Sequence, residues 1–299
     1  MSEMIALRLH TGSPRLFQTV APGLFVLLWA TGFLTARFGI PYANAMTLLA
    51  LRFSFAAVMM LAIAVLTRAI WPRSPRVILH LVVTGILLQA VYLGGCYAAI
   101  YAGIPAGMTA LIAGFQPILT AALAGPLLQE HLVARQWGGI LLGFIGLVLV
   151  IWDKLQLDLG HVWGLFFAIL SLLGITGATF YQKLFVPKVD LRSSAVIQYA
   201  ATTLVMWPVA AWVGVGDIHW EMPFILCMVW MVVVLSGISI ALLTWMIQHG
   251  AASKVSSLFY LTPPAAALGA YFCFGERLGL PALCGMAVVA VAIVLVNRR

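Results

Sequence analysis

Uncharged polar and aromatic side chains lie inside the long apolar runs of this sequence, and their spacing suits the binding of a small polar molecule. Gln89 and Tyr92 are three residues apart, so they share one face of a helix. Amide and hydroxyl groups can bind the amino and carboxyl groups of a zwitterion, while aromatic rings supply an apolar wall and a surface for a cation. We therefore expect a substrate-binding set that comprises Trp29, Gln89, Tyr92, Gln116, Trp163, Ser236, Ser239, Ser257 and Tyr260.

Each member of this set also has a structural interpretation. A serine in a membrane helix most often bonds to its own helix or lets helices pack closely, and we favour that role for the serines. Trp163 falls near a membrane surface, where a tryptophan anchor and a cavity wall are equally good interpretations. Glutamine is costly to bury in lipid, which favours a functional role for Gln89 and Gln116.

Ionisable side chains avoid the middle of the apolar runs, with one exception. All 8 acids and all 6 histidines fall in loops or near the ends of these runs. Intramembrane proton relays are usually built from Asp, Glu or His, so we expect no tight proton coupling, while sodium held by backbone carbonyls stays open. The exception is Arg52, for which snorkelling or another structural role is favoured over binding of a substrate carboxylate.

The composition places all these groups in a membrane. Of the 299 residues, 64% are hydrophobic and 8% are charged, and the mean hydropathy is +1.09. A soluble domain carries about 25% charged residues, so the bilayer must be the main solvent of this chain. Crossing ~30 Å of hydrocarbon takes ~20 helical residues. We expect an all-α integral membrane protein with ten transmembrane helices, at Phe17–Ala36, Asn44–Thr67, Val77–Ala99, Ala106–Pro126, Ala134–Trp152, His161–Gln182, Ser193–Gly214, Phe224–Ile247, Ser253–Phe274 and Leu280–Val296.

The positive charges indicate an orientation in the membrane. The net charge of +8 does not predict binding to nucleic acid, because the basic residues are spread over loops without an aromatic-interleaved basic face. If the N-terminal segment 1–16 is cytoplasmic, most of the 16 Lys and Arg residues fall on the cytoplasmic side. The positive-inside rule then predicts that both termini are cytoplasmic.

The sequence repeats itself at an interval of 146 residues, here called the repeat interval. A Pro, a Glu and a Gly recur in one register, as Pro117 with Pro263, Glu130 with Glu276, and Gly139 with Gly285. The repeat divides the chain after segment 1–16 into two five-span units, 17–152 and 153–299. Five is odd, so the two units insert upside down relative to each other, as in many secondary transporters. We expect each proline to lie in the middle of a helix, and Glu130 and Glu276 to brace turns or to act as symmetric gating latches.

At these positions the sequence resembles the EamA family of the drug/metabolite transporter superfamily. The resembling positions are Ala106-Gly107, Pro117, Glu130 to Leu132, Gly139, Gly143, Gly146 and Arg52-Phe53, with a looser match at Pro263, Gly275 to Leu278 and Gly285. The resemblance implies ten helices in two inverted repeats and a substrate cavity on the pseudo-twofold axis. It also implies export of small metabolites across the bacterial inner membrane by alternating access. Within the superfamily the sequence most resembles the amino-acid exporters of the YddG type, so amino acids are the expected substrates, with drugs or other metabolites as the alternative.

Other classes of membrane protein find less support in the sequence. A membrane-embedded enzyme is the competing interpretation, but we find no HExxH, no GxGD-type intramembrane acid and no Ser/His pair at a plausible depth. The chain also lacks a GxxxxGK[ST] phosphate loop, so it is not by itself an ATP-driven pump. A channel usually shows a selectivity-filter loop or a charged ring, and neither is evident in this sequence. We expect no enzymatic activity, no cofactor and no metal.

Overall fold

The described part of the chain is helical throughout. The computed structural model describes residues 15–128, 133–152, 159–240, 242, 246, 261–276 and 279–297, and none of these residues is in a strand. The helices of the first half are α2 (Arg15–Gly39), α3 (Ala45–Leu66), α4 (Pro75–Gly85), η1 (Ile86–Leu93), α5 (Gly94–Tyr101), α6 (Ala106–Ala113), α7 (Gln116–Leu128) and α8 (Ala134–Trp152). Those of the second half are α9 (Leu159–Phe185), α10 (Leu191–Val213), α11 (Met222–Val229), η2 (Trp230–Ser239), α14 (Thr262–Phe274) and α15 (Leu280–Asn297).

Six helical segments are long and apolar enough to cross a bilayer. Among the described residues these segments are Val20–Gly39, Ala45–Leu66, Pro75–Tyr101, Val162–Phe185, Leu191–Val213 and Met222–Ser239. Shorter apolar helical stretches accompany them at Ala106–Thr120, which is interrupted between α6 and α7, and at Ala134–Leu149 and Leu280–Ala292. These helices confirm the predicted class, an all-helical membrane protein. The predicted ninth span lies partly outside the described residues, so the count of ten remains a prediction.

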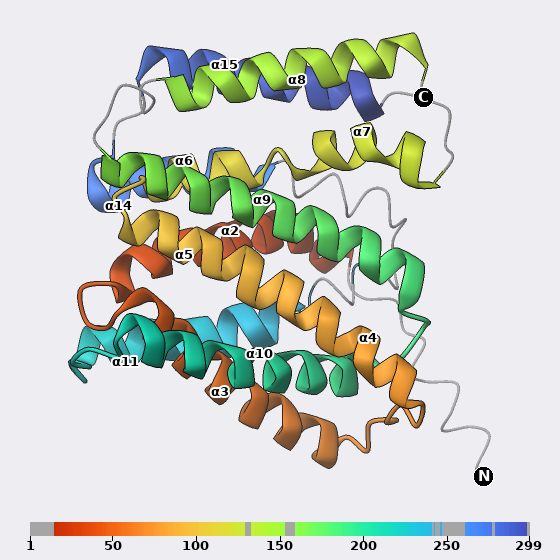
Figure 1. Cartoon of the computed structure of the whole chain (residues 1–299), viewed down its shortest axis with the longest axis vertical. Coiled ribbons are helices and arrows are strands. Elements are labelled where there is room, and N and C mark those ends of the chain that lie inside the picture. Colours follow the sequence, from red (N-terminus) through yellow and green to blue (C-terminus); the bar gives the residue numbers. More distant parts are fainter. Residues whose placement is uncertain are drawn as a thin grey trace.

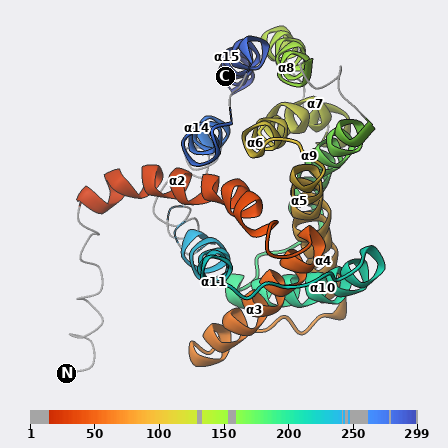
Figure 2. The ribbon, with the colours of Figure 1, turned by 90° about the vertical axis from the view of Figure 1, so that its left-hand side faces the viewer.

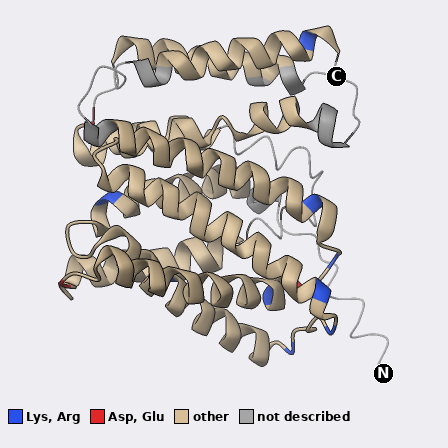
Figure 3. Cartoon of the chain, in the orientation of Figure 1, with Lys and Arg blue, Asp and Glu red and all other residues tan. Residues whose placement is uncertain are grey.

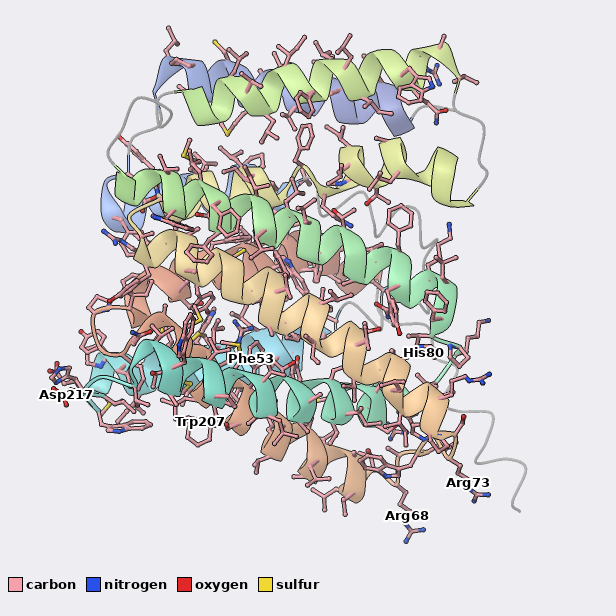
Figure 4. The ribbon with its side chains drawn as sticks, viewed as in Figure 1. Phe53, Arg68, Arg73, His80, Trp207 and Asp217 are labelled. Atoms are coloured by element: carbon pink, nitrogen blue, oxygen red, sulfur yellow. The ribbon has the colours of Figure 1, made fainter. Side chains whose placement is uncertain are left out.

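Most helices run roughly parallel to one another and form layers across the molecule (Figure 1). Helices α3 and α10 pack together at one side, and α8 and α15 form a pair at the opposite side (Figures 1 and 2). Lys and Arg gather where helices end, and more of them lie at one end of the bundle than at the other (Figure 3). Arg68 and Arg73 mark the basic end, whereas Asp217 lies at the other end (Figure 4).

Three pairs of corresponding helices in the two halves begin one repeat interval apart. The matching starts are Ala45 and Leu191 for α3 and α10, Gln116 and Thr262 for α7 and α14, and Ala134 and Leu280 for α8 and α15. Two of these pairs, α3 with α10 and α8 with α15, pack directly against each other. Two further contacts also join the halves in equivalent ways. Helix α2 of the first half packs on η2 of the second, and α9 of the second half packs on η1 of the first. This pattern is that of two halves related by a pseudo-twofold axis.

The paired helices are antiparallel, as inverted halves require. In the α8–α15 pair, Gly146 lies against Val289, while Gly143, one turn earlier, lies against Ala292, further along α15. In the α3–α10 pair the rings of Phe53 and Tyr199 stack at a centroid distance of 6.0 Å. These two residues are themselves separated by the repeat interval. The pseudo-twofold axis therefore passes close to the Phe53–Tyr199 contact.

Equivalent hydrogen bonds fasten α3 to α10 at both ends of the pair. At one end Thr47 Oγ1 donates a hydrogen bond to the carbonyl oxygen of Val215 at 2.8 Å. At the other end Ser193, which corresponds to Thr47 in the repeat, donates from Oγ to the carbonyl oxygen of Ile70 at 2.7 Å. The α3–α10 pair is thus tied into one unit by bonds that follow the sequence repeat.

The helix caps beside these bonds differ in charge. Asn44 caps α3 by accepting from the backbone N–H of Met46 at 3.0 Å, and its counterpart in the repeat, Asp190, caps α10 by accepting from that of Arg192 at 2.9 Å. Asp190 also pairs with the Arg192 guanidinium at 2.6 Å and accepts from the backbone N–H of Ile70 at 3.0 Å. The Arg192 hydrogen bond holds the pKa of the Asp190 carboxyl well below its usual range. One end of the pair is therefore held by a neutral cap and the other by an ionic one.

The predicted fourth span is broken and is not a continuous helix with Pro117 at its middle. Helix α6 ends at Ala113, and Pro117 is the second residue of α7. Proline is well tolerated in the first turn of a helix, where its missing N–H would have no intrahelical partner. Pro263 is likewise the second residue of α14. A Cβ on Gly114 would clash with the ring of Pro263, so the break lies where the two halves cross closely.

Two π-helical segments occupy corresponding positions in the two halves. Segment η1 ends at Leu93 and η2 ends at Ser239, and these two ends correspond to each other in the repeat. A π-helical turn closes from residue i to residue i+5 and frequently marks a functional site. Nothing in the sequence pattern predicted these segments.

Candidate functional site

A cavity lies among helices α2, α3, η1, α5, α9, α10 and η2. Its volume is about 110 Å³, smaller than the ~300–1,000 Å³ of a typical drug-sized ligand site. The residues that line it are Trp29, Gly32, Phe33, Ala36, Arg52, Leu88, Gln89, Tyr92, Leu93, Cys96, Tyr97, Ile100, Ile175, Tyr199, Leu235 and Ile240. Its wall is mainly apolar and comes from both halves of the chain.

Among the described lining residues, Arg52 is the one that carries a charge. The residue is only 7% exposed, and its Nη1 donates a hydrogen bond to the Tyr97 hydroxyl oxygen at 3.2 Å. The Tyr97 hydroxyl in turn donates to Met231 Sδ at 3.1 Å, which ties the pair to η2. The guanidinium also lies 5.7 Å from the centroid of the Phe53 ring, within the range of a cation–π contact. Nε of Arg52 is buried and has no hydrogen-bond partner within the described ranges.

Segment η1 supplies the other polar groups that the sequence predicted for this site. Gln89 and Tyr92 both line the cavity, as their spacing on one helix face suggests. The backbone behind Tyr92 is held by a close approach of α9, because a Cβ on Gly174 would be 2.9 Å from the Tyr92 nitrogen. Gly174 therefore allows α9 to lie this close to the cavity wall, because any side chain at this position would push the two apart.

Aromatic rings on α2 form another part of the cavity wall. Trp29 and Phe33 lie on α2, one turn apart, and both line the cavity. The ring of Trp29 packs against Phe25 with a centroid distance of 5.3 Å. A small molecule in this cavity would thus contact indole and phenyl rings on α2 and polar groups on α3, η1 and α5.

Comparison with known proteins identifies the class to which this cavity belongs. Residues 23–152 and residues 162–298 each match the model of the EamA-like transporter family. The chain belongs to the EamA-like transporter family. The resemblance to the EamA family that was read from the sequence is confirmed, and EamA-like proteins are transporters and not enzymes.

Two individual proteins are similar to this chain. The chain is 26% identical over 199 residues to the uncharacterized transporter YvbV of Bacillus subtilis (strain 168), an alignment that covers 66% of this chain and 64% of that protein. The chain thus spans less than two thirds of this relative. A solved structure described only as the crystal structure of a protein has a TM-score of 0.64 and 17% sequence identity, covering 95% of this chain and 98% of the other. At this identity the likeness shows the fold alone.

The structure divides the predicted substrate-binding residues of this EamA-like chain into three groups. Trp29, Gln89 and Tyr92 line the cavity together with Arg52. The remaining described members do not line it: Gln116, Trp163, Ser236 and Ser239. The others lie outside the described residues: Ser257 and Tyr260.

The members outside the cavity have other surroundings. The Gln116 amide donates to Thr179 Oγ1 at 3.1 Å, and Trp163 is 60% exposed beside the rings of Phe166 and Phe167. Ser236 is buried and donates to the carbonyl oxygen of Met231 at 3.1 Å. Ser239 is fully buried, and its hydroxyl has no partner among the described residues.

Three of the predicted structural and gating residues, Pro117, Pro263 and Glu276, lie at helix ends. Both oxygens of the Glu276 carboxylate accept hydrogen bonds of 3.3 Å, from the backbone N–H groups of Ala106 and Gly107. Glu276 of the second half thus caps helix α6 of the first half. Pro117 and Pro263 begin α7 and α14, as described above. Glu130 lies outside the described residues.

Sequence reasoning missed two tyrosines and one phenylalanine of the cavity wall. Tyr97 lies five residues after Tyr92, and the π-helical segment that ends between them brings both to the cavity. An α-helical spacing rule gives no reason to place those two together. Tyr199 and Phe33 showed no local signal, because their position depends on how α10 and α2 pack against other helices. No group of three or more His, Cys, Asp or Glu able to hold a metal occurs among the described residues.

Proposed function

We propose that this EamA-like protein is a secondary transporter that exports small metabolites, amino acids in the first place, across the bacterial inner membrane. The observation that carries the proposal is the cavity itself, because both halves contribute to its wall. Arg52 and Tyr92 come from the first half, and Tyr199 and Leu235 come from the second. Inverted halves with a site between them are the arrangement by which secondary transporters expose one site alternately to the two sides of the membrane.

The substrate class in this proposal is supported by the chemistry of the wall. An amide, three tyrosine hydroxyls and a guanidinium lie among apolar and aromatic side chains. This combination suits a small molecule with a polar head and an apolar body, such as an amino acid with an aromatic or branched side chain. Drugs or other metabolites are the alternative occupants.

Weak coupling and orientation are also part of the proposal. None of the described lining residues is an acid or a histidine, which are the usual members of intramembrane proton relays. We place the end of the bundle that carries Arg68 and Arg73 in the cytoplasm, because positive charge is enriched on that side of membrane proteins (Figure 4). Export then follows the gradient that the cell maintains, since alternating access is reversible.

Counterflow in proteoliposomes tests the proposal. Liposomes loaded with an unlabelled amino acid, sugar or nucleotide are diluted into the labelled compound, and saturable accumulation identifies the substrate. We expect accumulation of apolar amino acids, and we expect Gln89→Ala and Tyr92→Ala each to reduce it several-fold, since both side chains line the cavity. Gln182→Ala and Tyr101→Ala remove the same side chains from exposed positions and serve as matched controls.

Three results would count against the proposal. Absence of counterflow for every compound would reject secondary transport of these substrates. If Gln89→Ala and Tyr92→Ala transport as fast as Gln182→Ala and Tyr101→Ala, the cavity is not the substrate-binding site. Flux that accumulates substrate against its gradient when only a pH step is applied would reject weak coupling.

A further inference from the structure

We propose that Arg52 is the counter-ion of the transported molecule, so that the cavity selects compounds with one carboxylate and an apolar body and does not require an amino group. This inference rests on the proposed function, because it assumes that the cavity holds the substrate. It differs from the structural role that the sequence favoured for Arg52.

The first argument is the incomplete hydrogen bonding of a buried cation. An arginine side chain stays charged in proteins and has five N–H donors in a fixed fork. The hydrogen bond that the structure gives the Arg52 guanidinium is to the Tyr97 hydroxyl, and Nε is buried without a partner in the described part of the chain. At 7% exposure the residue lines the cavity and has little access to solvent elsewhere. A guanidinium held this way lacks the acceptors that a bidentate carboxylate supplies.

The second argument is that no described acid neutralises Arg52. Asp190 is paired with Arg192, and the Glu276 carboxylate caps α6. The other described acids are exposed at positions between α10 and α11, at Asp217 and Glu221. The titratable side chains that interact electrostatically with Arg52 are instead ones that are neutral at pH 7: Tyr92, Tyr97, Tyr199 and Cys227. A buried charge in a membrane is expensive unless it is paired, so a bound anion completes the site.

The third argument is the asymmetry of the cavity toward the two charges of an amino acid. A carboxylate has a dedicated cation in Arg52, but an ammonium group finds no described carboxylate in the wall. The amine can use only the Gln89 carbonyl, a tyrosine hydroxyl or the face of Trp29, which are weaker partners for a charge. Removing the amine from a substrate should therefore cost little, while removing the carboxylate should abolish recognition.

The snorkelling alternative fits the structure less well. A snorkelling arginine extends along apolar surface and keeps its head in the water or headgroup layer. Arg52 instead directs Nη1 to Tyr97, which is 1% exposed, and it lies against the cavity and not at a helix end. The Arg52–Tyr97 contact joins α3 to α5 across the inner wall, so the charge is held inside the bundle.

The test compares matched ligands on the full-length protein at pH 7. One set is phenylalanine, 3-phenylpropanoate and phenethylamine, and a second is leucine, 4-methylpentanoate and 3-methylbutylamine. Within each set the second compound lacks the amine and the third lacks the carboxylate. Binding is measured as the ligand-induced rise in melting temperature of the detergent-purified protein, and transport as inhibition of labelled amino-acid counterflow. We expect each carboxylate to bind within a few-fold of its amino acid, and each amine to bind at least about tenfold more weakly.

Variants assign the effect to Arg52. Arg52→Gln should lose the stabilisation by both carboxylate compounds, and Arg52→Lys should keep part of it, because lysine keeps the charge but not the fork. Arg37→Gln removes a cation from the exposed end of α2 and is the matched control. If Arg52→Gln does not fold, Arg52→Lys and the ligand comparison on the unaltered protein still decide the question.

The possible outcomes separate this inference from the proposed function. The inference is supported if the compounds with a carboxylate stabilise the protein, the amines do not, and Arg52→Gln loses this stabilisation. If counterflow is absent at the same time, only the transport proposal fails. Amino-acid counterflow that phenethylamine inhibits as well as 3-phenylpropanoate does would leave the transport proposal standing and overturn the inference. An Arg52→Gln protein that keeps the carboxylate effect, or the absence of any carboxylate effect, would also overturn it.

Discussion

Replacing Gly174 by alanine should push α9 away from the wall of the cavity. A Cβ at this position would be 2.9 Å from the backbone nitrogen of Tyr92 and 2.8 Å from Cγ1 of Val91. The nitrogen belongs to the backbone and cannot rotate away, so restoring ordinary contact needs about 0.5 Å of helix separation. Overpacking of this kind costs about 1–3 kcal/mol, which should lower the melting temperature by a few degrees. The displacement also moves Tyr92, so we expect substrate affinity to fall several-fold.

Gly177→Ala is the matched control for this prediction. Gly177 lies on the same helix, three residues after Gly174, and a Cβ there would meet nothing within 4 Å. Alanine is the better helix former by up to about 1 kcal/mol, so this variant should melt at the same temperature as the unaltered protein or higher. The measurements are thermal unfolding of the detergent-purified proteins and counterflow in proteoliposomes. If both variants melt alike and transport alike, the close approach of α9 to the cavity wall does not exist as described.

Two further predictions concern charged groups at helix ends. The lowered pKa of Asp190 means that its carboxylate stabilises the fold above the unfolded pKa of about 3.9 and that this stabilisation is lost as the pH falls through the lowered value. The melting temperature of Asp190→Asn should therefore lie below that of the unaltered protein at pH 7, with a gap that narrows below about pH 4. A gap that widens on acidification, or one equal to that of the exposed Asp217→Asn, would contradict the role of the Arg192 pair. Glu276→Gln removes the negative charge at the start of α6 and should destabilise the protein by about 0.3–1 kcal/mol in thermal unfolding. The Glu221→Gln control changes an exposed acid that makes no side-chain cap bond, and an equal loss there would refute the capping role.

The repeat and the fold class could be predicted because they depend on patterns along the chain. The repeat interval marked by Pro117 and Pro263 reappears in the starts of α7 and α14. The break before Pro117 could not be predicted, because it depends on Gly114 meeting the ring of Pro263 in the other half. A proline in a sequence indicates that a helix is perturbed there, but the tertiary crossing decides between a kink and a break.

The candidate site could be predicted only in part. Gln89 and Tyr92 were found because they are near in sequence and share one helix face. Arg52 and Tyr97 are far apart in sequence, and their hydrogen bond depends on the packing of α3 on α5. From sequence alone, the depth of Arg52 in its span was known but not the direction in which its side chain points. That direction decides between snorkelling and a place in the cavity wall.

The two π-helical segments bear on the ancestry of the chain. Each π turn holds one residue more than the α-helix would at the same place. The spacing between corresponding helix starts is the same before the segments, for α3 and α10, as it is after them, for α7 and α14. An extra residue gained by one half alone would have changed that spacing by one. Both halves therefore carry the same number of residues between these helix starts, which is the pattern expected if the π turns arose before the sequence was duplicated.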